Sequence, residues 1–415
     1  MTSNVVTTSL ADPVKLESLY HRDPATFVAQ LYEALENHPH SQILKFWRAR
    51  VEFQSKSFSK AGFTVSQLLQ LLLLCLTASL AVRLPALLPV SEEWYYPRVL
   101  PLVIGSALIV YFALRDTLPL QITKAILGIV IVTTTTVLLL PDNLNSSSIV
   151  MALLHAPLVM WCALGLAFCA EDWRCNDNRL TFLRYNGELF IYTMLILAGG
   201  LVLSLLTMGL FELLNLSIEE WYMRNIGLAG FISAPIVATF LFDRVLGRNS
   251  RLATLIANVF TPLFLVMVVL YLLAMAIAQS SPYTDRNFLI LFNGLLLLVL
   301  AMTIFSICGR NSDRPSMLAD AVNLGLIGVT LIVNLVALSA IVYRLSEWGL
   351  SPNRVVVTGA NLLIFTHLIW ISFSYLKLLR GRAESEDLTR AVTRMLPAYG
   401  VWAAFVMVGI PLLFE

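Results

Sequence analysis

The chain has 415 residues, of which 58% are hydrophobic and 13% are charged, and its formal net charge is +2. Soluble domains carry roughly 25% charged residues, so this composition excludes an ordinary soluble enzyme. Apolar stretches, each long enough to cross ~30 Å of hydrocarbon as a helix, recur from Val65 almost to the C-terminus. The sequence therefore predicts an all-α fold, a polytopic transmembrane helical bundle with about 11 transmembrane helices.

The N-terminal region, residues 1–62, is polar and is expected to be a cytoplasmic, basic and helical segment ahead of a transmembrane domain at 63–415. Asp12-Pro13 and Asp23-Pro24 each place a capping side chain before a proline, which predicts helix starts. Apolar residues then recur at helical spacing among Lys and Arg: Ile43, Leu44, Trp47 and Val51. This pattern fits either an interfacial amphipathic helix that contacts anionic lipid or a basic cytoplasmic flank.

The spanning helices are predicted from the apolar stretches that follow. They are expected at residues 65–87, 99–114, 119–140, 149–170, 189–213, 226–242, 252–277, 288–308, 318–343, 355–376 and 396–413. Lys and Arg are concentrated in alternate connections, and the segment 141–148 on the other side has neither. By the positive-inside rule, the N-terminus is expected inside and the C-terminus outside.

An internal repeat is indicated by one motif at two places. Glu92-Glu93-Trp94-Tyr95 is followed 127 positions later by Glu219-Glu220-Trp221-Tyr222, and Asp116 aligns with Asp243 at the same offset. A second step of this size reaches Ser346-Glu347-Trp348. Copies that are four helices apart share one orientation, which predicts parallel repeat units at approximately 63–186, 187–314 and 315–415, the last without its fourth helix. Trp at a membrane boundary and acids in water also explain the residue types locally.

The connection before the tenth helix carries a dense polar motif, Tyr343-Arg344-Leu345-Ser346-Glu347-Trp348-Gly349-Leu350-Ser351-Pro352-Asn353-Arg354. It resembles the signature of the bacterial membrane family catalogued as domain of unknown function 4153, with Trp348 in place of Tyr and Ser351 in place of Thr. The resemblance implies a bacterial cytoplasmic (inner) membrane location and no established activity. Gly349, Ser351 and Pro352 predict a tight helical hairpin. Together with Gly349, the remaining polar and aromatic residues form a candidate outer-face motif that either clamps the hairpin or contacts a ligand: Arg344, Glu347, Trp348, Gly349, Asn353 and Arg354.

Polar residues inside the spans are few, and they are functional hypotheses because their burial in lipid is costly. The candidate intramembrane polar site consists of His155, Asn334, Asn361 and His367. Lys124 and Asp320 lie near cytoplasmic ends, where the lysine can extend to the membrane surface and the aspartate can reach water or cap its helix. The sequence shows no metal-binding, cofactor-binding or nucleic-acid-binding motif, so no metal, no cofactor and no nucleic acid are expected.

Three functions remain open on the sequence. The first is a transport-like protein, a facilitator or flippase-like permease without an ATP motor, since spanning helices in parallel repeats can enclose a pathway. The second is a non-catalytic membrane scaffold or sensor that binds a protein partner at the cytoplasmic face. The third is a membrane-embedded transferase acting on a lipid-linked substrate, in which Arg344, Glu347 and Arg354 would act with the repeat acids.

Overall fold

The computed structural model describes residues 5–10, 12–22, 24–38, 41–59, 64–86, 88–213, 216–246, 251–278, 286–310 and 316–414. Within these ranges all regular structure is helical, as the sequence predicts. The chain divides into two compact units, one formed by Met1–Gln67 with Arg244–Gly247 and one by Leu68–Asp243 with Arg248–Glu415. Each unit is described by itself.

The N-terminal unit is a small helical domain with its own core. Its helices are α1 (Val5–Thr8), α2 (Pro13–Arg22), α3 (Pro24–Asn37) and α4 (Gln42–Ser59). The Asp12 carboxylate accepts the Lys15 N–H at 3.0 Å, and α2 and α3 begin at the two prolines, which confirms the predicted helix starts. Asp23 itself lies outside the described residues.

The apolar face of α4 packs inside this domain. The Trp47 ring contacts Phe27 at a centroid distance of 4.9 Å and Tyr20 at 5.6 Å, and Leu44 and Val51 are buried in the same core. Packing within the domain accounts for this periodicity, for which the sequence left an interfacial helix and a basic cytoplasmic flank open. The ion pair between Arg50 and Glu17, at 2.6 Å, joins α4 to α2.

The second unit contains the apolar helices. Its elements are α5 (Val65–Val82), η1 (Leu84–Ala86), α6 (Glu92–Arg115), α7 (Leu120–Leu139), α8 (Ser147–Cys169), η2 (Ala170–Asp172), α9 (Asn176–Leu213), α10 (Glu219–Tyr222), η3 (Met223–Gly227), α11 (Leu228–Phe240), η4 (Leu241–Val245), α12 (Leu252–Ala278), α13 (Arg286–Cys308), α14 (Met317–Trp348), α15 (Pro352–Leu379), α16 (Ser385–Arg394), α17 (Leu396–Ala404), η5 (Phe405–Gly409) and α18 (Ile410–Phe414). The described residues form 11 helical segments long and apolar enough to cross a membrane. The molecule is therefore a multi-pass membrane protein, and the predicted number of spans is confirmed.

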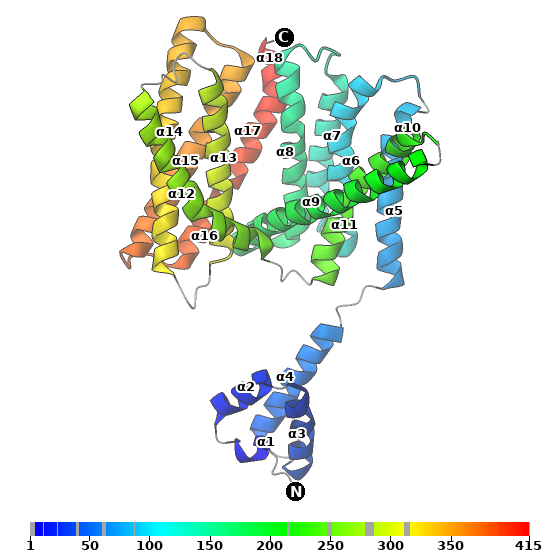
Figure 1. Cartoon of the computed structure of the whole chain (residues 1–415), viewed down its shortest axis with the longest axis vertical. Helices are drawn as coiled ribbons and strands as arrows, with labels where there is room; N and C mark the ends of the chain where they lie inside the picture. Colours follow the sequence, from blue (N-terminus) through cyan, green and yellow to red (C-terminus); the bar gives the residue numbers. More distant parts are fainter. Residues whose placement is uncertain are drawn as a thin grey trace. The chain divides into compact units, whose positions relative to one another are not determined.

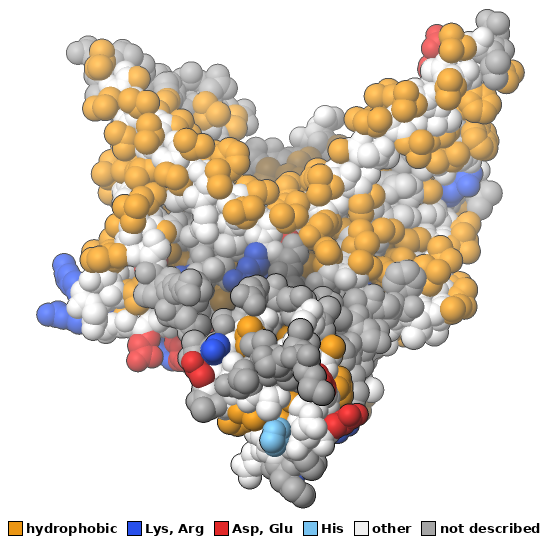
Figure 2. Space-filling view, turned by 60° about the horizontal axis from the view of Figure 1, so that its bottom comes forward, with side chains coloured by type: hydrophobic (Ala, Val, Ile, Leu, Met, Phe, Trp, Pro, Cys, Tyr) orange, Lys and Arg blue, Asp and Glu red, His pale blue; other side chains and the backbone are white. Residues whose placement is uncertain are grey.

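These helices form two packed groups, visible on either side of α17 in Figure 1. One group packs α6, α7, α8 and α11 around a single apolar core. The other packs α12, α13, α14 and α15 around two further cores. α8 belongs to the first group and joins it to the second, because it also contacts α15. α17 packs against α8 as well. Apolar side chains cover the flanks of the helices, as expected for surfaces that face lipid (Figure 2).

α9 crosses the bundle obliquely and links the two groups (Figure 1). Its 38 residues extend over about 57 Å, far more than the thickness of a bilayer, so it must tilt. The helix begins well before residue 189, where the sequence placed its start, because residues 176–188 pack against α16, α13 and the first turn of α12. The buried Glu188 carboxylate accepts the Ala253 N–H at 2.9 Å and caps α12 from outside that helix.

The two segments that carry the repeated motif pack on each other. Arg115 of α6 bonds Asp243 of η4 at 3.1 Å, and Arg224 of η3 lies 4.0 Å from Glu92 of α6. Their surroundings differ, since α6 packs mainly on α8 whereas α11 packs mainly on α9 and α6. The repeat therefore stays a prediction. The connections 116–119, 170–175 and 380–384 lie at one end of the bundle, at the bottom of the bundle in Figure 1. We call it the basic end, because arginines lie in these connections or at the adjoining helix ends: Arg115, Arg174, Arg179, Arg310, Arg380 and Arg382.

Candidate functional site

A stripe of buried polar residues runs along one face of α14. Its members are Asp320, Asn323, Thr330 and Asn334, each at most 5% exposed. At 100° and 1.5 Å per residue they fall within an arc of about 80° and extend over about 21 Å along the helix. That length is roughly two thirds of the hydrocarbon thickness. We call these four residues the α14 stripe.

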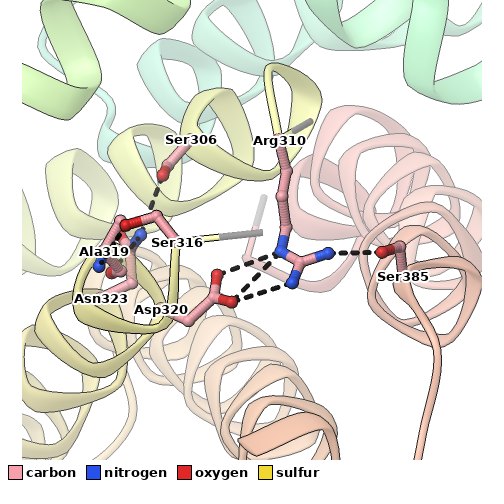
Figure 3. A network of polar contacts seen from close by, with 7 residues as sticks. All are labelled: Ser306, Arg310, Ser316, Ala319, Asp320, Asn323 and Ser385. Atoms are coloured by element: carbon pink, nitrogen blue, oxygen red, sulfur yellow. Dashed lines mark hydrogen bonds and ion pairs between the residues drawn. The ribbon is translucent and has the colours of Figure 1, made fainter. Parts of the chain in front are cut away.

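The stripe begins at the basic end in a buried ion pair. Asp320, in the first turn of α14, accepts hydrogen bonds from Arg310 Nε at 3.1 Å and Nη2 at 2.9 Å. Arg310 Nη1 also donates to the hydroxyl of Ser385, the first residue of α16 (Figure 3). The guanidinium therefore ties the end of α13 to the starts of α14 and α16. Asp320 is paired rather than open to water, unlike the expectation from its position near a helix end.

One turn further along α14, hydrogen bonds join three helices. Asn323 Nδ2 donates to Ser306 Oγ of α13 at 2.8 Å (Figure 3), and Ser306 Oγ donates to Asn258 Oδ1 of α12 at 3.0 Å. Asn323 Oδ1 is buried and has no hydrogen-bond partner within the described ranges. This acceptor is the first of several unsatisfied groups along the stripe.

The deeper half of the stripe carries hydrogen-bonding groups that the rest of the fold leaves unsatisfied. Thr330 Oγ1 and Asn334 Nδ2 on α14, and Thr303 Oγ1 on α13, are buried without a hydrogen-bond partner among the residues that the structure describes. A Thr hydroxyl in a helix usually returns to a backbone carbonyl of the preceding turn, as Thr133 does on Ile129 at 2.7 Å. An unsatisfied polar group in hydrocarbon costs several kcal/mol, so these three buried groups lack the compensation that Thr133 has.

α15 contributes two of the residues singled out in the sequence, and both are buried. Asn361 Nδ2 donates to Asn293 Oδ1 of α13 at 2.8 Å, and His367 Nδ1 lies 3.0 Å from the Tyr399 hydroxyl of α17. Asn334 and His367 lie at similar depth, each about 21–23 Å along its helix from the hairpin at 349–351. Asn334, Asn361 and His367 thus belong to the packed group α12–α15.

His155 stands apart from the other three candidates. It lies on α8, between the buried residues Ala152 and Ala156 of the other helix group, and its Nδ1 lies 2.8 Å from the Met151 carbonyl of its own helix. This local bond satisfies one imidazole nitrogen inside α8. We leave His155 out of the site formed around α14.

The 343–354 motif forms the hairpin that the sequence predicts. Gly349 has a φ of +69°, Ser351 is the N-cap residue of α15 without a side-chain cap bond, and Pro352 is the first helical residue. Arg354 Nη1 donates to the Gly349 carbonyl at 2.7 Å, and Asn353 Nδ2 lies 3.5 Å from Ser147 Oγ of α8. These contacts clamp the hairpin.

The other members of the motif lie in the last turns of α14. Arg344 is half-buried and Glu347 is exposed, whereas the Trp348 side chain lies outside the described residues. No contact of Arg344 or Glu347 that the structure describes defines a binding site. The part of the motif with a structural explanation is therefore Gly349 with Asn353 and Arg354.

The repeat-boundary residues lie at helix starts. Glu92 and Glu93 form the first turn of α6, whose N-cap Ser91 accepts the Trp94 N–H at 3.3 Å. The corresponding residues of α10 are Glu219, Glu220 and Trp221, all exposed. Arg224 lies between the two sets, 3.4 Å from Glu220 and 4.0 Å from Glu92. Acids in the first turn of a helix stabilise it, so these residues fit a structural role.

Asn323, Thr330, Asn293 and Arg310 are site residues that the sequence reasoning did not select. The spacing of the α14 stripe, 3, 7 and 4 positions, is the helical period, so a search for polar residues on one face could have found Asn323 and Thr330. Asn293 and Arg310 carry no such signal. Their roles depend on which helix lies opposite.

Comparisons of the chain with family models, with curated proteins and with solved structures found no match. The resemblance to domain of unknown function 4153 therefore rests on residues 343–354, whose hairpin contacts are described above.

Proposed function

We propose that the protein is a membrane facilitator that lets a small, uncharged polar solute cross the bilayer along the α14 stripe, between helices α12 and α15. The observation that carries this proposal is a set of buried groups without a hydrogen-bond partner in the described part of the chain, Thr330 Oγ1 and Asn334 Nδ2 in the deeper half of the stripe and Thr303 Oγ1 on α13. Hydroxyl and amide groups offer donors and acceptors without a net charge. A solute that can exchange hydrogen bonds with them loses less on leaving water.

The arrangement favours facilitated passage over ion-coupled transport. The stripe's one carboxylate, Asp320, is engaged by Arg310 at the basic end. Coupled transporters commonly use an acid near the middle of the membrane, and the middle of this stripe carries an amide and a hydroxyl instead. His367, at similar depth on α15, contacts the Tyr399 hydroxyl of α17. The Arg310–Asp320 pair lies at the basic end of the stripe, where a gate that controls entry of the solute would lie.

Solute flux into proteoliposomes tests the proposal. Vesicles containing the full-length protein are exposed to a hyperosmotic step of urea, glycerol or erythritol, and their reswelling is followed by light scattering. Wild-type vesicles are expected to reswell faster than protein-free vesicles with at least one of these solutes. No acceleration with any of the three contradicts the proposal.

Asn334→Leu is the informative variant, because the substitution keeps a similar volume and removes the amide. Loss of one hydrogen bond of about 0.5–1.5 kcal/mol to the passing solute lowers the flux about 2- to 10-fold. The variant should be as thermally stable as wild type or more stable, since Asn334 Nδ2 makes no hydrogen bond to the described residues that the substitution could remove. Leu335→Met, at the adjacent lipid-facing position, is the matched control and should leave the flux unchanged.

A second candidate function is a scaffold or sensor that binds a protein partner through the N-terminal unit. The observation that favours it is that this unit has an aromatic core of its own and still exposes Tyr32, Ile43 and Phe46. Co-purification with native membranes separates the two functions. Retention of a partner that depends on residues 1–60, with no solute flux, favours the scaffold.

The membrane and orientation proposed here are the bacterial inner membrane with the basic end in the cytoplasm. The one-sided distribution of Lys and Arg supports this orientation, and the family resemblance supports the membrane. Labelling of a cysteine placed at Arg382, in the connection 380–384, in intact cells against permeabilised cells tests the orientation. Labelling in intact cells contradicts it.

A further inference from the structure

A second feature, separate from the α14 stripe, is a groove between α8 and α17 with a volume of about 350 Å³. Its walls are apolar and include Val159 and Leu166 of α8 and Val401 and Ala404 of α17. The volume lies in the range of small-ligand pockets, roughly 300–1,000 Å³. The groove lies on the flank of spanning helices, so its apolar length is available to an acyl chain.

Two glycines allow close packing in the walls of the groove. A Cβ at Gly400 would lie 2.9 Å from Cys162 Sγ, and a Cβ at Gly165 would lie 3.1 Å from Cε1 of Phe182. All four residues line the groove. A larger residue at Gly400 would push against α8, and one at Gly165 would push against Phe182 of α9, so either would change the walls of the groove.

The groove ends at a cation in the headgroup region. Arg179, in the first turns of α9, is the one charged residue among those that line it, and Trp173 lines the same end. Arg179 Nε donates to the Trp173 carbonyl at 2.7 Å, and Nη1 lies 3.4 Å from the Thr393 carbonyl. These bonds use two of the five N–H donors of the guanidinium. Arg394 follows Thr393 directly and is exposed, which brings a second positive charge to this end.

The neighbouring acids do not line the groove. Glu171 and Asp172 are exposed in the same connection and are absent from the lining residues. Trp prefers the level of lipid headgroups, and a guanidinium can bind a phosphate in a bidentate manner. An apolar groove that ends at Arg179 beside Trp173 therefore matches a phospholipid in both charge and polarity.

We propose that the groove between α8 and α17 binds an acyl chain of an anionic phospholipid whose phosphate contacts Arg179. The lipid would bridge three elements, because α8 and α17 hold the chain and α9 holds the headgroup. This site does not depend on the proposed solute path, since it lies against other helices.

Native mass spectrometry of the full-length protein in detergent tests the proposal, with phosphatidylglycerol and phosphatidylcholine as probes. Wild type is expected to bind phosphatidylglycerol at least tenfold more tightly than phosphatidylcholine. Arg179→Gln should remove this preference, and Ala404→Trp, which fills the groove and keeps the arginine, should weaken the binding of both lipids at least fivefold. Leu335→Trp, on the lipid-facing side of α14, is the control and should change neither.

Three outcomes overturn the proposal. The first is equal affinity of wild type for the two lipids. The second is unchanged binding in Ala404→Trp, which remains decisive if Arg179→Gln fails to fold. The third is tight binding of glycerol 3-phosphate alone, since a headgroup that binds without its chain identifies a phosphate site rather than a lipid groove.

Discussion

The buried ion pair at the start of the α14 stripe gives a quantitative prediction. Asp320 and Arg310 make N···O contacts from 2.9 to 3.3 Å, and their side chains are 8% and 12% exposed. Asp320→Ala removes the carboxylate and leaves the guanidinium buried with the Ser385 hydroxyl as its remaining partner in the described structure. Removing one partner of a buried pair costs about 3–5 kcal/mol. Because the long arginine stem can turn toward water at the helix end, we expect the lower value, about 3 kcal/mol.

The double variant Arg310→Met/Asp320→Ala should recover most of this loss. With both charges removed no unpaired ion remains, and a methionine fills the space of the arginine stem. The expected cost relative to wild type is about 1 kcal/mol, so the two sites should show a coupling of about 2 kcal/mol or more.

Equilibrium unfolding in mixed detergent micelles, followed by near-ultraviolet circular dichroism, measures these free energies. Glu220→Ala is the control, because Glu220 forms an exposed pair with Arg224 at 3.4 Å, which is worth at most about 1 kcal/mol. A free energy of unfolding for Asp320→Ala within 1 kcal/mol of wild type would refute the reasoning. So would a double variant less stable than Asp320→Ala.

Two further predictions concern packing. Gly187→Ala should destabilise the protein by about 1–3 kcal/mol, because the new Cβ would lie 2.6 Å from Cε1 of Phe305 and 2.7 Å from Cβ of Ala253. Gly200→Ala on the same helix places its Cβ where nothing lies within 4 Å, and it should stabilise the protein by up to about 1 kcal/mol. The same unfolding titration compares the two variants, and equal effects on the free energy of unfolding contradict the packing around Gly187. Trp47→Ala should lower the free energy of unfolding of the N-terminal unit by about 3–5 kcal/mol and increase amide hydrogen exchange across residues 5–59, because Trp47 is buried in its core. Phe46→Ala, at an exposed position, should have neither effect. Similar exchange in both variants contradicts the core assigned to this unit.

The sequence predicted the membrane class and the number of spans because the bilayer sets a minimum apolar length. It misplaced helix starts where a helix continues past the apolar stretch. α9 begins at Asn176 because its polar first turns pack against α16 and α13, and that packing is a tertiary effect. In the N-terminal unit, the apolar face of α4 was visible in the sequence, but its partners Phe27 and Tyr20 were not.

Individual residues of the candidate site could be predicted from the sequence, but their hydrogen-bond partners could not. Asn334, Asn361 and His367 were selected because polar groups in lipid are costly, and the structure buries all three. The partners Asn293 and Tyr399 depend on which helices are neighbours, and that arrangement is set by long-range packing. Asn323 and Thr330 could have been found from their helical spacing with Asp320.

The measurement that tests the central claim most directly is water access along α14. Single cysteines at Thr330, Asn334 and Leu335 are introduced in a variant without the five native cysteines and treated in proteoliposomes with a membrane-impermeant thiol reagent. If the stripe lines a solute path, cysteines at 330 and 334 react at least tenfold faster than the cysteine at 335, which faces lipid. Equally slow reaction at all three positions contradicts the account, because a solute could not then reach the stripe from water.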